Sequence, residues 1–248
     1  MLTTLFSSPI EFALACVILL IAQFVYVMFG FGAGLIAAGA LALVLPEFQD
    51  VVVLLLVLNL PSELWVCWKS RKEIRWRPIA LLGVGVAVGI PCGTYFLTQG
   101  DPRFILLLLG VFLMAVGLLF LRLPSGGSRR APRWAAPPVG FLSGILAGLF
   151  GTAGPPLIVW YHLTAGSKTA FRGNLMTIFL LMNIVRVPSY AVCGLFMPTR
   201  LWSALAILPM AMLGAWLGHR LHIRLSEQAF RRWVSALLVV LGLLLVLR

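Results

Sequence analysis

The chain has 248 residues, of which 61% are hydrophobic and only 10% are charged. A soluble domain is about 25% charged, so this composition leaves no room for a soluble domain and predicts an all-α polytopic membrane protein. The net charge of +12 does not indicate a nucleic-acid partner, because basic residues of membrane proteins gather in short cytoplasmic loops.

Ten apolar segments follow one another along the chain, five in each half. In the first half they lie at about 9–28, 33–46, 50–68, 78–98 and 103–121. In the second half they lie at about 135–150, 155–165, 171–197, 200–219 and 227–247. This pattern predicts one domain that contains a first transmembrane repeat at 1–123, a cytoplasmic linker at 124–134 and a second transmembrane repeat at 135–248.

The two halves share the order of their glycine and polar residues. The aligned pairs are Phe29-Gly30 with Phe150-Gly151, Asn59 with Asn183, Gly89 with Gly214, Gly93 with Gly218 and Gly117 with Gly242. Their common order indicates an internal duplication. Two sets of glycines spaced four residues apart also predict closely packed membrane helices. These sets are Gly85, Gly89 and Gly93, and Gly140, Gly144 and Gly148.

The basic residues predict how the chain crosses the membrane. Fifteen of the 19 Lys and Arg residues fall in four segments, at 69–77, 122–133, 166–172 and 219–232. Such clusters mark the cytoplasmic side. With these segments inside, both termini lie outside the cytoplasm, and the two halves are inverted repeats. Secondary transporters use this plan, with a site at mid-membrane between discontinuous helices.

Each half contains one break in its apolar pattern. In the second half, FGTAGPPL at 150–157 carries two prolines, which lack backbone donors, and two glycines, which weaken a helix. FGFGAGLI at 29–36 is its counterpart in the first half. The segments that follow rise about 21 and 16 Å, too little to cross about 30 Å of hydrocarbon. Broken or re-entrant helix hairpins are therefore predicted near residues 29–36 and 150–158.

The start of the short helix after each break offers unpaired N–H groups and the positive end of a helix dipole, which favour anions. Two such ends, related by the duplication, predict a small electropositive pocket near the middle of the membrane. In the other interpretation, the glycines at the breaks only allow the helices to pack closely.

Arg186 lies near the middle of segment 171–197. A basic side chain there costs at least about 2.5 kcal/mol on insertion scales, so Arg186 needs a partner. Glu63 occupies nearly the corresponding place in segment 50–68. Two interpretations are open: a structural pair between Arg186 and Glu63, or a cation that binds an anionic substrate. Proton coupling through Glu63 is a further alternative.

Other polar residues also have two interpretations. Asn59 and Asn183 either bind substrate or form interhelical hydrogen bonds, and Arg172 is either a membrane-surface anchor or a site residue. His162 is expected at the interface. No metal site and no cofactor are predicted, because the four cysteines lack metal-ligand spacing. The candidate substrate-binding residues are Gly30, Gly32, Gly34, Asn59, Gly151, Thr152, Gly154, Pro155, Arg172, Asn183 and Arg186.

The stretch GFLSGILAGLFGTAGPPLIVWY, followed by KTAFRGNL, resembles the second-half signature of the TauE/SafE family of sulfite exporters and sulfonate permeases. FGFGAGLIAAGALALVLP resembles the first-half counterpart, and the resemblance covers nearly the whole chain. Ala33 and Ala153 stand where family members often have a third glycine. The signature positions that carry over are Gly151, Gly154, Pro155, Pro156 and Arg172, with Gly30 and Gly34 in the first half.

The resemblance implies an inner-membrane carrier of small anions, driven by an ion gradient and working by alternating access. Its substrates would be sulfur-containing anions, such as sulfite, thiosulfate or sulfoacetate, or organic acids. Its other partners would be the lipid bilayer and a coupling ion, for which H⁺ is the candidate. The alternatives are an accessory or assembly protein and a membrane-embedded enzyme. The absence of HExxH and GxSxG motifs and the presence of only seven acidic residues speak against the enzyme.

Overall fold

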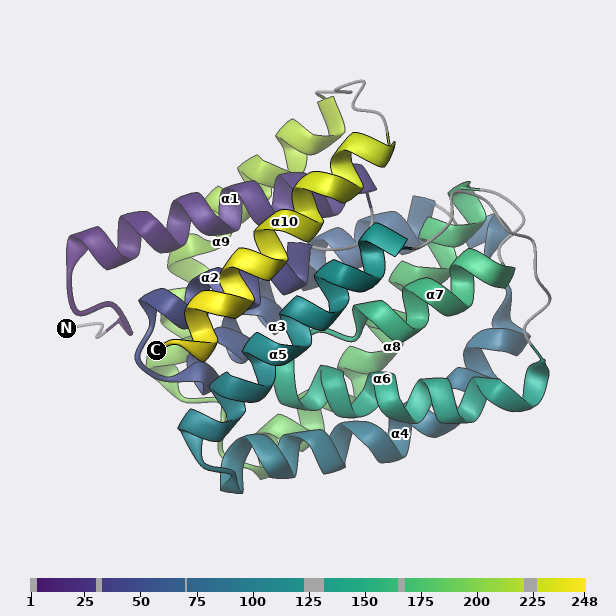
Figure 1. Ribbon diagram of the computed structural model, residues 1–248, viewed down its shortest axis with the longest axis horizontal. Coiled ribbons are helices and arrows are strands. Elements are labelled where there is room, and N and C mark those ends of the chain that lie inside the picture. Colours follow the sequence, from purple (N-terminus) through teal and green to yellow (C-terminus); the bar gives the residue numbers. More distant parts are fainter. Residues whose placement is uncertain (1–3, 30–32, 70, 123–131, 165–167, 221–226) are drawn as a thin grey trace. The chain divides into compact units, whose positions relative to one another are not determined.

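The computed structural model describes residues 4–29, 33–69, 71–122, 132–164, 168–220 and 227–248. The first five α-helices are α1 (Pro9–Phe29), α2 (Ala33–Val44), α3 (Phe48–Lys69), α4 (Trp76–Gln99) and α5 (Pro102–Arg122). The next five are α6 (Ala136–Phe150), α7 (Gly154–Thr164), α8 (Lys168–Val192), α9 (Pro198–Arg220) and α10 (Glu227–Val246) (Figure 1). Short 3-10 helices, η1 (Arg71–Glu73) and η2 (Arg133–Ala135), precede α4 and α6. The described residues contain no strand, so the predicted all-α class is confirmed.

Six of the described helices are long and apolar enough to cross a membrane: α1, α3, α4, α5, α8 and α9. The chain is therefore a multi-pass membrane protein. α2 has 12 residues and α7 has 11, so neither spans the hydrocarbon alone. Each packs against the helix before it, as expected for the predicted hairpins. The depth of the two hairpins in the bilayer and the orientation of the termini stay predictions.

α8 ends earlier than the sequence pattern predicts. The predicted segment runs over 171–197, but the helix stops at Val192. Gly194 has φ 70°, and the N–H of Leu195 donates to the carbonyl of Tyr190 over 2.9 Å. This bond and the left-handed glycine form a Schellman motif, which ends a helix. The prediction was wrong here because the apolar run continues through the glycine that stops the helix.

The helices form two compact units, and each unit takes helices from both halves of the chain. Unit 1 comprises Met1–Val57, Gly100–Ser125 and Met197–Arg248, and unit 2 comprises Leu58–Gln99 and Gly126–Phe196. Unit 1 therefore contains α1, α2, α5, α9, α10 and the start of α3, whereas unit 2 contains α4, α6, α7, α8 and the rest of α3. The units do not coincide with the predicted repeats, whose boundaries stay a prediction.

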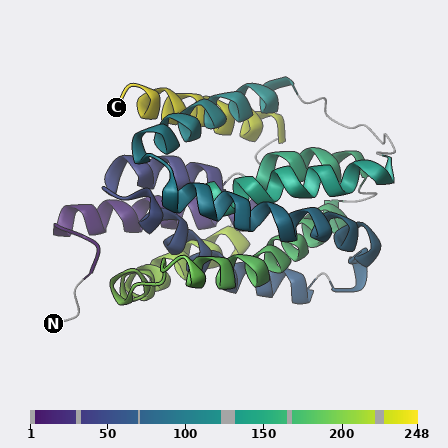
Figure 2. The ribbon, with the colours of Figure 1, turned by 90° about the horizontal axis from the view of Figure 1, so that it is seen from below.

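Unit 2 is built on a close contact between α4 and α6 (Figures 1 and 2). The two predicted glycine sets occupy this contact: Gly85, Gly89 and Gly93 of α4, and Gly140, Gly144 and Gly148 of α6. A Cβ atom on any of them would meet the backbone of the partner helix, so the predicted close packing is confirmed. The facing glycines keep their order along both helices, from Gly85 beside Gly140 onward, so α4 and α6 run parallel.

Unit 1 contains the corresponding contact between α9 and α1. A Cβ atom on Gly214 of α9 would meet the backbone of Leu20 in α1. In the same unit α5 and α10 lie side by side, with Gly110 against Gly242 (Figure 2). The fourth helix of each half therefore packs on the first helix of the other half. This exchange supports the predicted duplication, while the inverted orientation of the repeats stays a prediction.

Candidate functional site

The predicted break in the second half is confirmed. α6 ends at Phe150, and Gly151 adopts the left-handed region with φ 71°. Its N–H donates to the carbonyl of Ala147 over 3.0 Å, a helix-ending bond that favours glycine because other L-residues are strained at this φ. α7 begins at Gly154. Pro155 follows in the first turn of α7, where a helix tolerates a missing N–H.

The tandem prolines reduce the number of donors at the start of α7. The first four N–H groups of a helix have no partner within the helix. Pro155 and Pro156 occupy two of these four positions and supply no N–H, so only Gly154 and Leu157 do. The positive end of the helix dipole remains. An anion at this end therefore needs further donors from other helices.

Arg186 of α8 supplies such donors beside the break. Its side chain is 5% exposed. Nη1 donates to the carbonyl of Gly151 over 3.5 Å and to Oδ1 of Asn183 over 3.3 Å. Nη2 donates to the hydroxyl of Tyr190 over 3.4 Å, and the guanidinium carbon lies 5.2 Å from the centre of that ring. Because the C-terminal end of a helix favours a cation, Arg186 also stabilises the end of α6.

Asn183 joins Arg186 to Glu63. Its Nδ2 donates to Oε2 of Glu63 over 2.6 Å, while its Oδ1 accepts the bond from Arg186. Glu63 lies on α3 and is 4% exposed. Asn183 therefore forms an interhelical hydrogen bond, which is one of the two roles considered for it in the sequence. The two buried charges belong to one network, linked through an amide.

Tyr190 is a further member of this network and was not among the predicted residues. Its hydroxyl donates to the carbonyl of Gly148 over 3.0 Å and lies 3.4 Å from the carbonyl of Ala147. Both carbonyls belong to the last turn of α6, where carbonyl groups have no N–H partner within the helix. The sequence signal is the spacing, because Tyr190 follows Arg186 by four residues and so shares its helix face.

A sequence model of the family described as "Sulfite exporter TauE/SafE" matches residues 14–245 of this chain. The chain belongs to the TauE/SafE family. The "Probable inner membrane transporter protein TsaS" of Comamonas testosteroni is 30% identical over 196 residues, which cover 77% of this chain and 80% of that relative. The "Probable sulfite/organosulfonate exporter TauE" of Cupriavidus necator is 25% identical over 222 residues, or 88% and 87% of the two chains. No solved structure matches.

The resemblance to TauE/SafE that the sequence motifs indicated is thus confirmed. TauE/SafE proteins are membrane transporters, so the chain is a transporter and not an enzyme. In this TauE/SafE chain, the second-half signature forms most of α6, the break, α7 and the start of α8. The network of Arg186, Asn183 and Glu63 lies in the same compact unit as that signature.

The structure describes only some of the other predicted site residues of the TauE/SafE chain. Gly30 and Gly32 lie outside the described residues, as do the side chains of Arg172 and His162. The described ones lie near the two breaks or on α3: Gly34 in the first turn of α2, Asn59 one turn before Glu63, Thr152 within the second break, and Gly154 and Pro155 at the start of α7. Within the described ranges, no three His, Cys, Asp or Glu side chains could hold a metal ion.

A second buried arginine of this TauE/SafE protein has a different environment. Arg200, at the start of α9 in unit 1, donates from Nε to Oδ1 of Asp50 over 2.6 Å and from Nη2 to Oε2 of Glu47 over 3.0 Å. These are short, charge-assisted bonds within one unit, which indicate a structural ion pair. Sequence reasoning did not find this pairing, because the three charges lie at the ends of predicted apolar segments, where an ionic residue does not need a buried partner.

We expect Tyr190→Phe to lower the free energy of unfolding by about 1–2 kcal/mol, because it removes the hydroxyl that pairs with the carbonyl of Gly148. Denaturant unfolding in detergent measures this change. Tyr161→Phe on α7 is the matched control, since the Tyr161 hydroxyl has no hydrogen-bond partner among the described residues. Its effect should stay within about 0.5 kcal/mol. Equal losses in the two variants would contradict the role given to Tyr190.

Proposed function

We propose that this protein is a secondary transporter of small oxyanions, most of all sulfite and organic sulfonates, and that it works by alternating access. The TauE/SafE membership supports the proposal, as do the names of its relatives, an inner membrane transporter and a sulfite/organosulfonate exporter. The observation that carries it is the buried guanidinium of Arg186 beside the α6–α7 break.

Arg186 has the chemistry that an oxyanion requires. A guanidinium is a planar fork that can donate two parallel bonds to a sulfonate or carboxylate. Three of its contacts, those with Gly151, Asn183 and Tyr190, span 3.3 to 3.5 Å and go to uncharged groups. Charge-assisted bonds to an anion are shorter, about 2.7–2.9 Å. An oxyanion can therefore replace these long contacts with stronger ones.

Two further donors lie on α7, the helix that starts at the break. Trp160 is 6% exposed and Tyr161 is 3% exposed. The Trp160 Nε1 and the Tyr161 hydroxyl have no hydrogen-bond partner among the described residues. Buried donors in native proteins are nearly always paired, and an explanation is needed where they are not. Oxygens of an anion bound beside α7 would pair with them, so we assign both residues to the substrate site together with Arg186.

Glu63 is the group through which we propose that protons are coupled to transport. It is buried in the network of Arg186 and linked to that cation through Asn183. A proton on Glu63 removes the negative charge that offsets Arg186. The remaining positive charge then favours an anion, so binding of H⁺ and binding of the anion reinforce each other.

The test is binding followed by transport. The purified protein is heated with sulfite, thiosulfate, sulfoacetate, taurine, sulfate or acetate. A ligand at a hundred times its dissociation constant stabilises the folded state by about 2.7 kcal/mol. We expect stabilisation by sulfite or a sulfonate, and uptake of the same anion into proteoliposomes that increases with an inward proton gradient.

Two variants connect the result to the site. Arg186→Lys keeps the charge but loses the planar fork, so the stabilising anion should bind at least tenfold more weakly. Tyr161→Phe should weaken anion binding while leaving the stability of the free protein unchanged. A stabilising anion that is not taken up, or that binds both variants as tightly as the wild type, would contradict the proposal.

A further inference from the structure

The turn between α3 and α4 carries a dense group of exposed cations. Among the nine residues 69–77 there are five basic residues and one acidic residue, Glu73. We call the five cations the basic turn: Lys69, Arg71, Lys72, Arg75 and Arg77, all of which are exposed. The turn that connects α8 to α9 in the second half, 193–197, contains no Lys or Arg. In the predicted inverted topology that turn lies on the opposite side of the membrane, so the two turns differ in charge as the enrichment of Lys and Arg in cytoplasmic loops requires.

The backbone of the basic turn is held in place by a buried side chain. Asn174 of α8 accepts a hydrogen bond at Oδ1 from the N–H of Arg75 over 2.7 Å, which pairs a donor at the start of α4. Its Nδ2 donates to the carbonyl of Glu73 over 3.3 Å and to that of Ala170 over 2.6 Å. The cations thus project from a fixed backbone, so less conformational freedom is lost when they bind a ligand.

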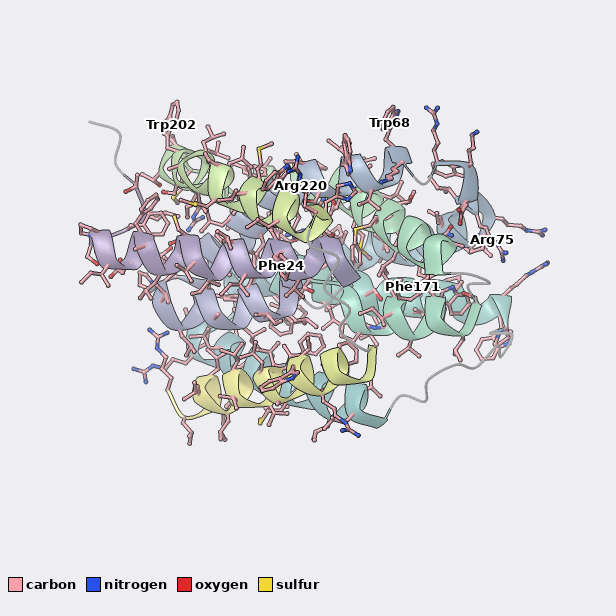
Figure 3. The ribbon with its side chains drawn as sticks, turned by 90° about the horizontal axis from the view of Figure 1, so that it is seen from above. Phe24, Trp68, Arg75, Phe171, Trp202 and Arg220 are labelled. Carbon is pink, nitrogen blue, oxygen red and sulfur yellow. The ribbon has the colours of Figure 1, made fainter. Side chains whose placement is uncertain are left out.

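Exposed tryptophans flank the basic turn. Trp68 at the end of α3 and Trp76 at the start of α4 are both 62% exposed. The guanidinium carbon of Arg71 lies 5.6 Å from the centre of the Trp68 ring. Figure 3 shows Trp68 pointing outward, with Arg75 on the turn that follows. Tryptophan rings gather at the headgroup level of a bilayer, so these side chains place the basic turn at the depth of lipid phosphates.

The start of α6 adds to the same surface. Because α4 and α6 run parallel, their first residues lie at the same end of the pair. Arg133 and Trp134, just before α6, are therefore on the side of the basic turn, and both are exposed. The combined surface presents cations and indole rings together, which is the chemistry that recognises an anionic headgroup at a membrane surface.

We infer that the basic turn is a binding site for the headgroup of an anionic phospholipid. The experiment uses the full chain in a neutral detergent, with phosphatidylglycerol as the probe and phosphatidylcholine as the neutral comparison. Native mass spectrometry counts the lipids that remain bound. The test variant is Arg71→Gln/Lys72→Gln/Arg75→Gln, whose side chains are exposed, so the fold should be preserved. The matched control is Arg103→Gln/Arg220→Gln/Arg232→Gln, which removes the same charge from exposed positions of unit 1.

The wild type and the control should retain phosphatidylglycerol in preference to phosphatidylcholine, and the test variant should bind it at least tenfold more weakly. Equal losses in the two triple variants would mean that net charge alone attracts the lipid, and would overturn the inference. Equal retention of the two lipids by the wild type would overturn it as well. Because no transported substrate is used, the outcome is independent of the proposed function.

The role of Asn174 gives a second test that changes no charge. Asn174→Ala removes the bonds that fix the turn, and we expect a severalfold loss of phosphatidylglycerol affinity in the folded protein. Cys67 of α3 provides a control position. Its Sγ lies 3.5 Å from the hydroxyl of Thr177 on α8, the helix that also carries Asn174. Cys67→Ala should leave lipid binding unchanged. Unchanged affinity in Asn174→Ala would show that a fixed backbone is not part of the site.

Discussion

Gly89→Ala is expected to prevent the correct packing of α4 on α6. The added Cβ atom would overlap the backbone carbonyl of Phe141 and would lie 2.9 Å from the backbone nitrogen of Ile145. A backbone cannot turn away as a side chain can, so the helices must separate along their whole contact. We expect a loss of at least about 3 kcal/mol in the free energy of unfolding, the upper end of the effect of overpacking. Unfolding in detergent and the yield of monodisperse protein measure it.

Gly83→Ala is the matched control, on the same helix and with the same added methyl group. The nearest atom to a Cβ atom on Gly83 is Cδ2 of Leu181, at 3.2 Å, which is the flexible tip of a side chain. A small rotation of that side chain relieves the contact, so the free energy of unfolding should change by less than about 1 kcal/mol. If Gly89→Ala were as stable as Gly83→Ala, the close contact of α4 and α6 would be refuted.

Arg186→Met is expected to abolish transport and to destabilise the protein. The change leaves the carboxylate of Glu63 in a buried network without the cation, and it leaves the carbonyl of Gly151 without its donor. Removal of one member of a buried charged network costs about 3–5 kcal/mol. Unfolding in detergent and uptake by proteoliposomes measure the two effects separately.

The double variant Arg186→Met/Glu63→Gln separates stability from transport. The glutamine amide would be neutral but would keep an oxygen that accepts the bond from Asn183. We therefore expect the double variant to regain about 1–2 kcal/mol of stability and to remain inactive in transport. Recovery of transport by the double variant would show that Arg186 is structural and does not bind the anion. A single variant as stable as the wild type would contradict the network itself.

The positions of the helices could be predicted from the sequence, because lipid imposes a simple rule on the chain. Every backbone donor in hydrocarbon must be paired within a helix, so each apolar segment predicts one helix. The tandem prolines with Gly151 and Gly154 likewise predict a break, since two missing donors cannot be replaced there. The end of α8 could not be found in this way, because Gly194 lies within an apolar run and acts through its φ angle.

Residues of the candidate site could be predicted from the sequence only where a single side chain carries a large energetic cost within the membrane. Arg186 and Glu63 are charges in apolar segments, and each needs a partner wherever it lies. The partners themselves depend on how helices pack. Tyr190 is an ordinary aromatic residue in the sequence and gains its role from two carbonyls of α6. The link through Asn183 also requires α3 and α8 to be neighbours, which hydropathy does not reveal.

The exchange of helices between the halves has a consequence for how the protein is made. The ribosome synthesises α1 long before α9, on which α1 makes its larger contact, since α1 ends at Phe29 and α9 begins at Pro198. At about 5–20 residues per second, α1 waits roughly 10 to 30 s for its partner. Unit 2 is complete once Phe196 has been synthesised, whereas unit 1 needs the chain to its last residues. The middle of the polypeptide can therefore assemble first, and α1 gains its contact with α9 only late in synthesis.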